Sequence, residues 1–159
     1  MNILTRTETA DFLKANDRYL ILTHTRPDGD TVGSAAALCL GLRAMGKTAH
    51  VLENKEVTPR YRWLHRGLTP NMLPEDFQPL LGRIRLRVDH HGSATSFTDF
   101  ELVDPDSASC AEIIYDLLTL LGCPLDQKIA EAVYVGASTD TGCFRYANTT
   151  AHTFAAAAA

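Results

Sequence analysis

The chain has 159 residues, of which 45% are hydrophobic and 21% are charged, and its formal net charge is −4. This length supports one well-buried domain and excludes two of ordinary size, while the composition argues against disorder. The negative charge excludes the broad basic surface that binds long duplex nucleic acid, although metal ions can still attract a small phosphorylated ligand locally.

The cysteines Cys39, Cys110, Cys123 and Cys143 are far apart in the sequence and form no CxxC pair. This usage is typical of reduced thiols in a cytoplasmic protein. The N-terminus shows no secretory signal, and no apolar run approaches the roughly 18 residues of a membrane helix. We therefore expect a soluble cytoplasmic protein that contacts no membrane.

Strands and helices are expected to alternate along the chain. Thr5 and Glu8 have capping-box spacing, and apolar runs that end in polar loops are typical of buried parallel strands. The expected elements are a helix at 5–15, a strand at 19–23, a helix at 31–45, a strand at 49–52, a short helix at 60–65 behind a Thr58-Pro59 cap, a strand at 83–88, a strand end at 102–103, and helices at 107–121 and 126–137. This order predicts an α/β fold with a mostly parallel sheet flanked by helices.

The last segment, TTAHTFAAAAA, begins like a helix and reaches the final residue without a stop signal. This pattern predicts that the native chain continues, and the alternative is an alanine-rich disordered end.

The loop after the first expected strand, His24-Thr-Arg-Pro-Asp28-Gly-Asp30, carries an imidazole and two carboxylates. In doubly wound sheets, ligands bind beyond the carboxyl ends of the strands, where this loop lies. A mixed nitrogen and oxygen ligand set suits manganese, iron, zinc or magnesium. The alternative is a polar turn in which Asp30 caps the helix that follows.

Two further clusters carry similar groups. Asp89-His90-His91-Gly92 follows a strand, and there one imidazole can bind metal, Asp89 can orient a ring nitrogen, and the other imidazole can face a phosphate. A pair of surface histidines is the alternative. Asp140, in Gly136-Ala-Ser-Thr-Asp140-Thr-Gly142, is expected to follow a helix among small residues that permit close approach, although Asp-Thr-Gly is also a good turn. Together the three clusters predict convergence at one edge of the sheet.

HTRPDGD, VDHHGS and GASTDTGCFRYANTT resemble the first, third and fourth signature motifs of the DHH phosphoesterase superfamily. The chain is most similar to the oligoribonuclease/pAp-phosphatase branch, whose members combine a DHH domain with a DHHA1 domain. The resemblance extends from about Thr5 to Phe154 and implies a DHH catalytic domain over 1–159. It also implies hydrolysis of short oligoribonucleotides or of 3′-phosphorylated nucleotides such as pAp, by water that two metal ions activate.

By this resemblance, His24 and Asp28 hold one divalent cation, and Asp30, His90 and Asp140 hold the second. Family members usually use manganese, with magnesium or other divalent ions as alternatives. The expected partner is a nucleotide or a short single-stranded oligonucleotide, and the resemblance also allows a homodimer.

The resemblance further implies that His91 contacts the scissile phosphate and that Asp89 supports it. Arg145 is a candidate to face the phosphate oxygens. Ser34 is a candidate to donate a hydrogen bond to the phosphate, with close helix packing as the alternative.

The chain departs from the family pattern between the first and third motifs. The family's second motif supplies an Asp at a strand end that bridges both metals, and the carboxylates available between Asp30 and Asp89 are Glu53, Glu56, Glu75 and Asp76, none of which ends an apolar strand. Arg83, Arg85 and Arg87 also alternate through a strand that should be apolar if both faces were covered. We therefore expect an internal segment to be missing near 78–85, or a degenerate site.

No DHHA1 domain is found in the chain, and poor nucleotide affinity is expected without it. Other readings are a non-enzymatic nucleotide- or metal-binding module, and another DHH activity such as a cyclic-dinucleotide phosphodiesterase.

Overall fold

The computed structural model of the chain describes residues 2–92 and 95–159, so Ser93, the last residue of the VDHHGS motif, lies outside the described residues. In chain order, the elements are β1 (Asn2–Ile3), α1 (Arg6–Ala15), β2 (Tyr19–Ile21), α2 (Gly29–Ala44), β3 (Ala49–Val51), the 3₁₀ helices η1 (Arg62–His65) and η2 (Glu75–Gly82), β4 (Leu86–Asp89), β5 (Phe100–Val103), α3 (Cys110–Leu120), α4 (Gln127–Asp140) and α5 (Ala151–Ala158). The predicted alternation of strands and helices is confirmed.

Side-chain caps explain where the helices begin. Thr5 accepts a hydrogen bond from the backbone N–H of Glu8, whose carboxylate accepts one from Thr5 N–H in return, so the predicted capping box is present. Asp126 caps α4 by accepting from Ile129 N–H at 2.9 Å. α4 runs three residues beyond its predicted end at 137 and includes Asp140.

The predicted cap at Thr58-Pro59 is wrong. The short helix is the 3₁₀ helix η1, which starts at Arg62, follows Tyr61 and has no side-chain cap. The backbone before it forms a separate turn instead, in which Tyr61 N–H donates to the Thr58 carbonyl at 3.0 Å. The strand predicted at 83–88 is also shorter and begins only at Leu86.

All strand pairs of the described chain are parallel, which confirms the predicted α/β class. The strands form two separate sheets, one with the order β1-β5-β4 and one with β2-β3. In the first sheet Arg87 of β4 lies opposite Glu101 of β5. β4 and β2 are each the edge of their own sheet, and each strand leads directly into one of the His/Asp loops.

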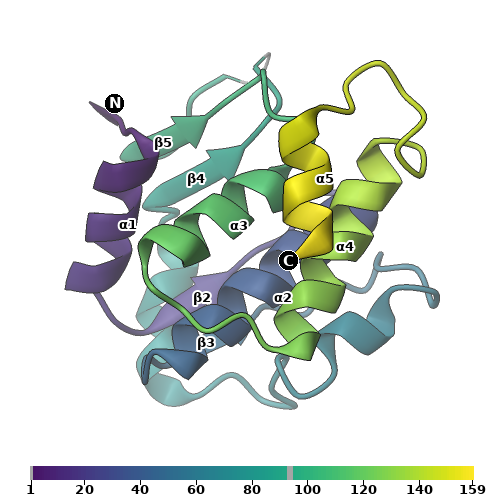
Figure 1. Cartoon of the computed structure of the whole chain (residues 1–159). Helices are drawn as coiled ribbons and strands as arrows, with labels where there is room; N and C mark the ends of the chain where they lie inside the picture. Colours follow the sequence, from purple (N-terminus) through teal and green to yellow (C-terminus); the bar gives the residue numbers. More distant parts are fainter. Residues whose placement is uncertain (1, 93–94) are drawn as a thin grey trace.

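The helices join the two sheets. α2 packs on β2 and β3, α3 packs on β4, and α2 packs against both α3 and α4 (Figure 1). Fully buried side chains of these helices, including Val32, Ile113, Leu117 and Ile129, make the core. Because α2, α3 and α4 meet in this core, the start of α2, the start of α3 and the end of α4 are brought to one place.

The close approach of α2 and α4 depends on Gly33. A Cβ on Gly33 would lie 2.4 Å from the Ala132 carbonyl oxygen and 3.1 Å from the Gly136 nitrogen. Gly33→Ala is therefore expected to destabilise the fold by about 1–3 kcal/mol through overpacking, because backbone atoms cannot turn away as a side chain can. Urea unfolding measures this change in the free energy of unfolding.

Gly82→Ala is the matched control, because a Cβ there meets no atom of the described chain within 4 Å. It should change the free energy of unfolding by no more than about 0.5 kcal/mol. Equal losses in the two variants would contradict the close packing of α2 on α4.

Candidate metal centre

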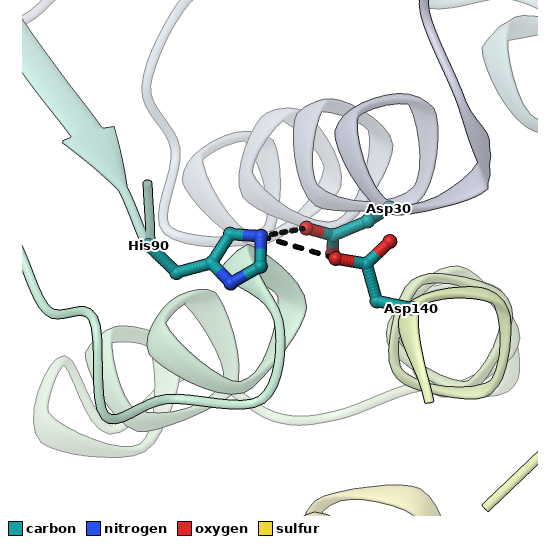
Figure 2. Close-up of side chains that lie close together, drawn as sticks. All are labelled: Asp30, His90 and Asp140. Carbon is teal, nitrogen blue, oxygen red and sulfur yellow. Dashed lines mark ion pairs between the residues drawn. The ribbon is translucent and has the colours of Figure 1, made fainter. Parts of the chain in front are cut away.

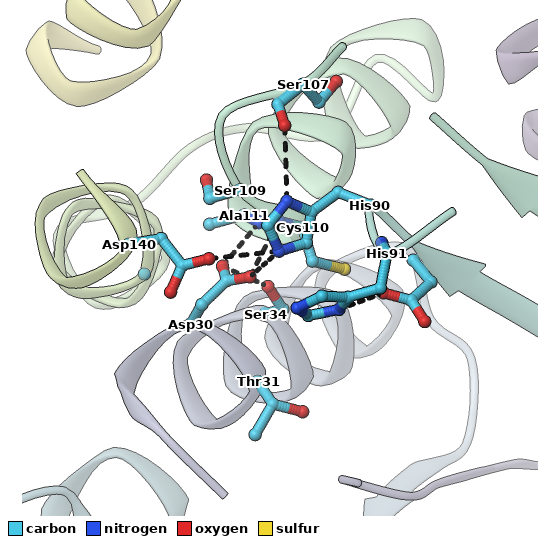
Figure 3. Close-up of polar contacts among 12 residues, drawn as sticks. Asp30, Thr31, Ser34, His90, His91, Ser107, Ser109, Cys110, Ala111 and Asp140 are labelled. Carbon is cyan, nitrogen blue, oxygen red and sulfur yellow. Dashed lines mark hydrogen bonds and ion pairs between the residues drawn. The ribbon is translucent and has the colours of Figure 1, made fainter. Parts of the chain in front are cut away.

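Asp30 lies in the first turn of α2, and its side chain points to the start of α3. Its Oδ2 accepts a hydrogen bond from Cys110 N–H at 2.8 Å, and its Oδ1 accepts one from Ala111 N–H at 2.9 Å (Figure 3). These N–H groups belong to a helix N-terminus, where a carboxylate is favoured. Asp30 is only 3% exposed. The alternative interpretation, in which Asp30 caps α2, is wrong, because Asp28 accepts from Thr31 N–H instead.

His90 follows β4, and one nitrogen of its ring is held by the loop before α3. Its Nδ1 lies 3.3 Å from the Ser107 carbonyl oxygen, which can only accept, so Nδ1 carries the proton of the neutral ring. Nε2 is then left with a lone pair and lies 3.7 Å from Asp30 Oδ2 and 3.0 Å from Asp140 Oδ2 (Figure 2). This nitrogen is buried and has no well-aligned hydrogen-bond partner in the described chain.

Asp140 is the last residue of α4, not part of the loop after it as expected. α4 can bring it close to α2 and α3 because Gly136 lies between them. A Cβ on Gly136 would meet the Ala111 Cβ at 2.5 Å and Asp30 Oδ1 at 3.0 Å. Small residues in the last turn of α4 thus allow the Asp30 and Asp140 carboxylates to approach each other.

Asp30, His90 and Asp140 each offer a ligand atom, and these atoms all lie within 4.8 Å of one another. The side chains come from three elements and point toward one another (Figure 2). Two carboxylates and one imidazole nitrogen suit a divalent cation such as manganese, zinc or iron. An Nε2 with no aligned partner fits this reading, since a cation would satisfy it. We call these residues the central cluster.

Burial and neighbouring carboxylates shift the pKa values of Asp30 and His90 in the central cluster. Burial, with the Asp140 carboxylate as the second cause, raises the pKa of Asp30 to about 6 against the hydrogen bonds from α3. The Asp140 side chain, with smaller help from Asp30, raises the pKa of His90 to about 9 although burial opposes it. Without a metal ion the His90 proton therefore supplies the positive charge between the two carboxylates.

The metal-free protein should lose stability as the pH rises from about 6.5 to 9. The folded-state pKa of His90, about 9, exceeds its ordinary value of 6.5, so its contribution is fully present below 6.5 and is lost as the pH rises through 9. One pKa unit corresponds to about 1.4 kcal/mol, which limits the loss to a few kcal/mol. Urea unfolding with a chelator across this range measures it. His90→Ala should flatten the fall, and an unchanged fall in that variant would contradict the assignment.

The two other predicted metal ligands lie beside the central cluster but do not join it. His24 Nε2 is 3.7 Å from Asp28 Oδ1, and both side chains are nearly half exposed. The His24 ring centroid lies 6.4 Å from that of His91, which is 4.3 Å from that of His90. His24 and Asp28 thus form a pair next to the histidines. Glu56 accepts a hydrogen bond from Arg26 N–H in this loop at 2.8 Å.

Asp89 and His91 form a second pair at the end of β4. Asp89 Oδ1 lies 2.8 Å from His91 Nδ1 and accepts a hydrogen bond from His91 N–H at 3.0 Å. Burial alone would raise the pKa of Asp89, but the hydrogen bonds from His91 and Arg87 outweigh it and lower this pKa to about 2. Asp89 is therefore ionised, and the half-exposed ring of His91 can present Nε2 outward.

The two candidate substrate-binding residues are placed differently. Ser34 is 5% exposed, and its hydroxyl donates to Asp30 Oδ1 at 3.3 Å, so it supports the central cluster from within α2. Arg145 is exposed, and its Nε donates to the Gly142 carbonyl at 2.9 Å. Its roles toward a substrate stay predictions, as do those of Ser34.

Sequence reasoning missed the groups that hold the cluster from the β5–α3 side. These are the Ser107 carbonyl and the N–H groups of Cys110 and Ala111. The buried side chain of Arg87, which holds Asp89, was missed as well. The spacing of Ser109 and Glu112 was the available signal, because Ser109 caps α3 and accepts from Glu112 N–H. This spacing marks a helix N-terminus, which is a site for anions.

The sequence model described as DHH family, N-terminal domain, matches residues 18–137. The chain belongs to the DHH family, which confirms the class of phosphoesterase that the motifs predicted. It is 35% identical to the bifunctional oligoribonuclease and PAP phosphatase NrnA of Thermus thermophilus, over 89% of this chain and 49% of that protein. It is 28% identical to the Bacillus subtilis protein of the same name, over 93% of this chain and 54% of that protein.

A solved structure of an exopolyphosphatase-related protein from Bacteroides fragilis has the same fold. It superposes with a TM-score of 0.70 at 20% identity and covers 96% of this chain and 54% of its own. The chain thus spans about half the length of the curated relatives it matches. None of the helices in the part of the chain that the structure describes has the length and hydrophobicity of a membrane span.

The relatives also have additional residues inside the matched region. The alignment with the Thermus protein runs over 159 positions, yet 89% of this chain is only about 142 residues, so that protein has about 17 more positions. The Bacillus alignment runs over 168 positions against about 148 residues of this chain, a surplus of about 20.

Proposed function

We propose that the chain is the DHH domain of a metal-dependent phosphoesterase that hydrolyses short oligoribonucleotides, 3′-phosphorylated nucleotides such as pAp, or both. The observation that carries this proposal is the convergence of Asp30, His90 and Asp140 from three elements. The names of the Thermus and Bacillus relatives support the substrate class. We further place the protein in the cytoplasm, in line with four cysteines that are all free thiols.

Two divalent cations, with manganese as the leading candidate, complete the proposed site. Asp30, His90 and Asp140 hold one, and the more exposed pair of His24 and Asp28 holds the other. Bound there, the cations would lower the pKa of a water molecule and would neutralise charge on the phosphoryl oxygens. The backbone N–H groups at the start of α3 keep Asp30 in place while it carries its charge.

His91 is the proposed catalytic residue toward the scissile phosphate. Its Nδ1 donates to Asp89, and more than half of its side chain is exposed, so Nε2 of the protonated ring is free to donate to a phosphate oxygen. Asp89 orients the ring and does not contact the substrate. Arg145 is proposed to approach the same phosphate from the loop after α4, and Ser34, whose hydroxyl donates to Asp30 in the metal-free protein, is the second proposed substrate-binding residue.

We also propose that a strand is missing between β4 and β2, from a segment lost near 78–85. The split into two sheets supports this, as do the additional residues of about 17 to 20 positions in the relatives. Glu53, Glu56, Glu75 and Asp76 do not join the central cluster, so no carboxylate from between Asp30 and Asp89 bridges it in the described chain. Sequencing of the transcript across the codons for residues 78–85 tests the proposal. Additional codons there support it, and a transcript that encodes the present sequence without additional codons contradicts it.

The split sheet also favours the second candidate function, a non-enzymatic module that binds metal or nucleotide through a degenerate site. Incubation of the purified protein and Mn²⁺ with pAp, a five-nucleotide RNA and a cyclic dinucleotide separates the two. Release of phosphate from pAp or of mononucleotides from the RNA supports the phosphoesterase. Bound manganese with no product from any of the three substrates contradicts it and supports the binding module.

A further inference from the structure

A row of charged side chains leads from the inner strand β5 to His91. Glu101, Arg87, Asp89 and His91 follow one another in contact, and only the last of them is largely exposed. The proposed function has used neither Glu101 nor Arg87, and Arg87 is the one of the two that contacts Asp89. Its side chain is 7% exposed, which is rare for an arginine and requires partners for its donors.

Arg87 binds both Asp89 and His91. Its Nε and Nη2 donate to Asp89 Oδ2 at 3.1 and 2.6 Å, and Nη2 also donates to the His91 carbonyl oxygen at 3.0 Å. Because Arg87 occupies Oδ2, the other carboxylate oxygen of Asp89 is the one that faces His91 N–H and Nδ1. The guanidinium therefore fixes which way the carboxylate faces.

Glu101 holds the guanidinium from the neighbouring strand. It lies directly opposite Arg87 in the parallel ladder, with its Oε2 3.9 Å from Arg87 Nη1. Glu101 in turn accepts a hydrogen bond from the Thr98 hydroxyl at 3.2 Å. The Phe97 ring lies 5.7 Å from the guanidinium carbon, within the range of a cation–π contact. With its neighbours on two sides, the planar fork has little freedom to rotate.

We propose that Arg87 is a positioning residue for hydrolysis: it orients Asp89 so that Nδ1 of His91 donates to that carboxylate, and Nε2, which carries the second proton of the protonated ring, points to the substrate phosphate. The proposal rests on the proposed function for the role of His91. A purely structural role, in which Arg87 only ties β4 to β5, would leave the tautomer of His91 unchanged.

The test measures the His91 tautomer by ¹⁵N NMR of the imidazole at a pH where the ring is neutral, together with kcat and KM for pAp. In the unmodified protein Nδ1 is expected to carry the proton. In Arg87→Met the ring should become a mixture of tautomers, with kcat lowered on the order of 10- to 100-fold and KM and manganese affinity little changed. Arg87→Lys, which keeps the charge without the fork, should give intermediate values.

Arg83→Met is the matched control, since the exposed Arg83 pairs with Asp99 and does not touch Asp89. It should match the unmodified protein in every reading. If Arg87→Met does not fold, Arg87→Lys decides: a His91 tautomer identical to that of the unmodified protein overturns the proposal. A shifted tautomer in a protein without hydrolysis supports the positioning role and contradicts the proposed function instead.

Discussion

Replacement of His90 by alanine is expected to abolish phosphoester hydrolysis and to lower the metal content of the purified protein. His90 Nε2 is the only nitrogen among the three ligand atoms of the central cluster, and its removal leaves the Asp30 and Asp140 carboxylates facing each other. Like charges at this distance repel, so Asp30, already with a raised pKa, is expected to take up a proton. We expect turnover to fall by more than about 10³-fold.

Initial rates with pAp and metal analysis by mass spectrometry measure the effect of His90→Ala. His152→Ala is the control, because His152 is paired with Asp116 outside the central cluster. That control should keep both its metal and its rate. A His90→Ala variant with near-normal turnover would reject the central cluster as the site of hydrolysis.

Replacement of His91 by alanine is expected to separate catalysis from metal binding. His91 does not belong to the central cluster, and its ring is held by Asp89 instead. Loss of its Nε2 should reduce kcat by about 10² to 10⁴-fold, the usual contribution of a positioned proton donor, while manganese content stays unchanged. Parallel metal analysis and single-turnover kinetics on one preparation make the measurement. Equal losses of metal and turnover would show instead that His91 is a ligand.

The general position of the site could be predicted from the sequence. Asp30 and His90 each come shortly after an expected strand, and parallel strands bring their carboxyl ends to one edge, so the α/β pattern alone predicts that they converge. The small residues around Asp140 likewise indicated a close approach, which the contact of Gly136 with Ala111 bears out.

The different roles of Asp28 and Asp30 could not be predicted from the sequence. Asp28 and Asp30 both precede the helix closely enough to cap it, and local sequence does not distinguish them. The choice is made by Cys110 and Ala111, eighty residues further along the chain, whose N–H groups bind Asp30 and leave Asp28 to cap α2. Contacts of this kind depend on how α2 and α3 pack, which residue periodicity does not specify.

The arginines of the β4 segment show the same limit. Their alternation was interpreted as the sign of a missing segment, and Arg87 is the one of the three that lies within β4. The alternation did not reveal that Arg87 is buried against Asp89 and Glu101, since the opposing residue is known only once the register of β4 and β5 is known.

Anomalous diffraction from crystals grown with Mn²⁺ tests the central claim most directly. A manganese peak bonded to a carboxylate oxygen of Asp30, to Nε2 of His90 and to a carboxylate oxygen of Asp140 is the predicted result. Crystals whose manganese lies elsewhere, with the His90 ring still between two carboxylates that hold no ion, would contradict the claim that these three elements fold together to bind a catalytic cation.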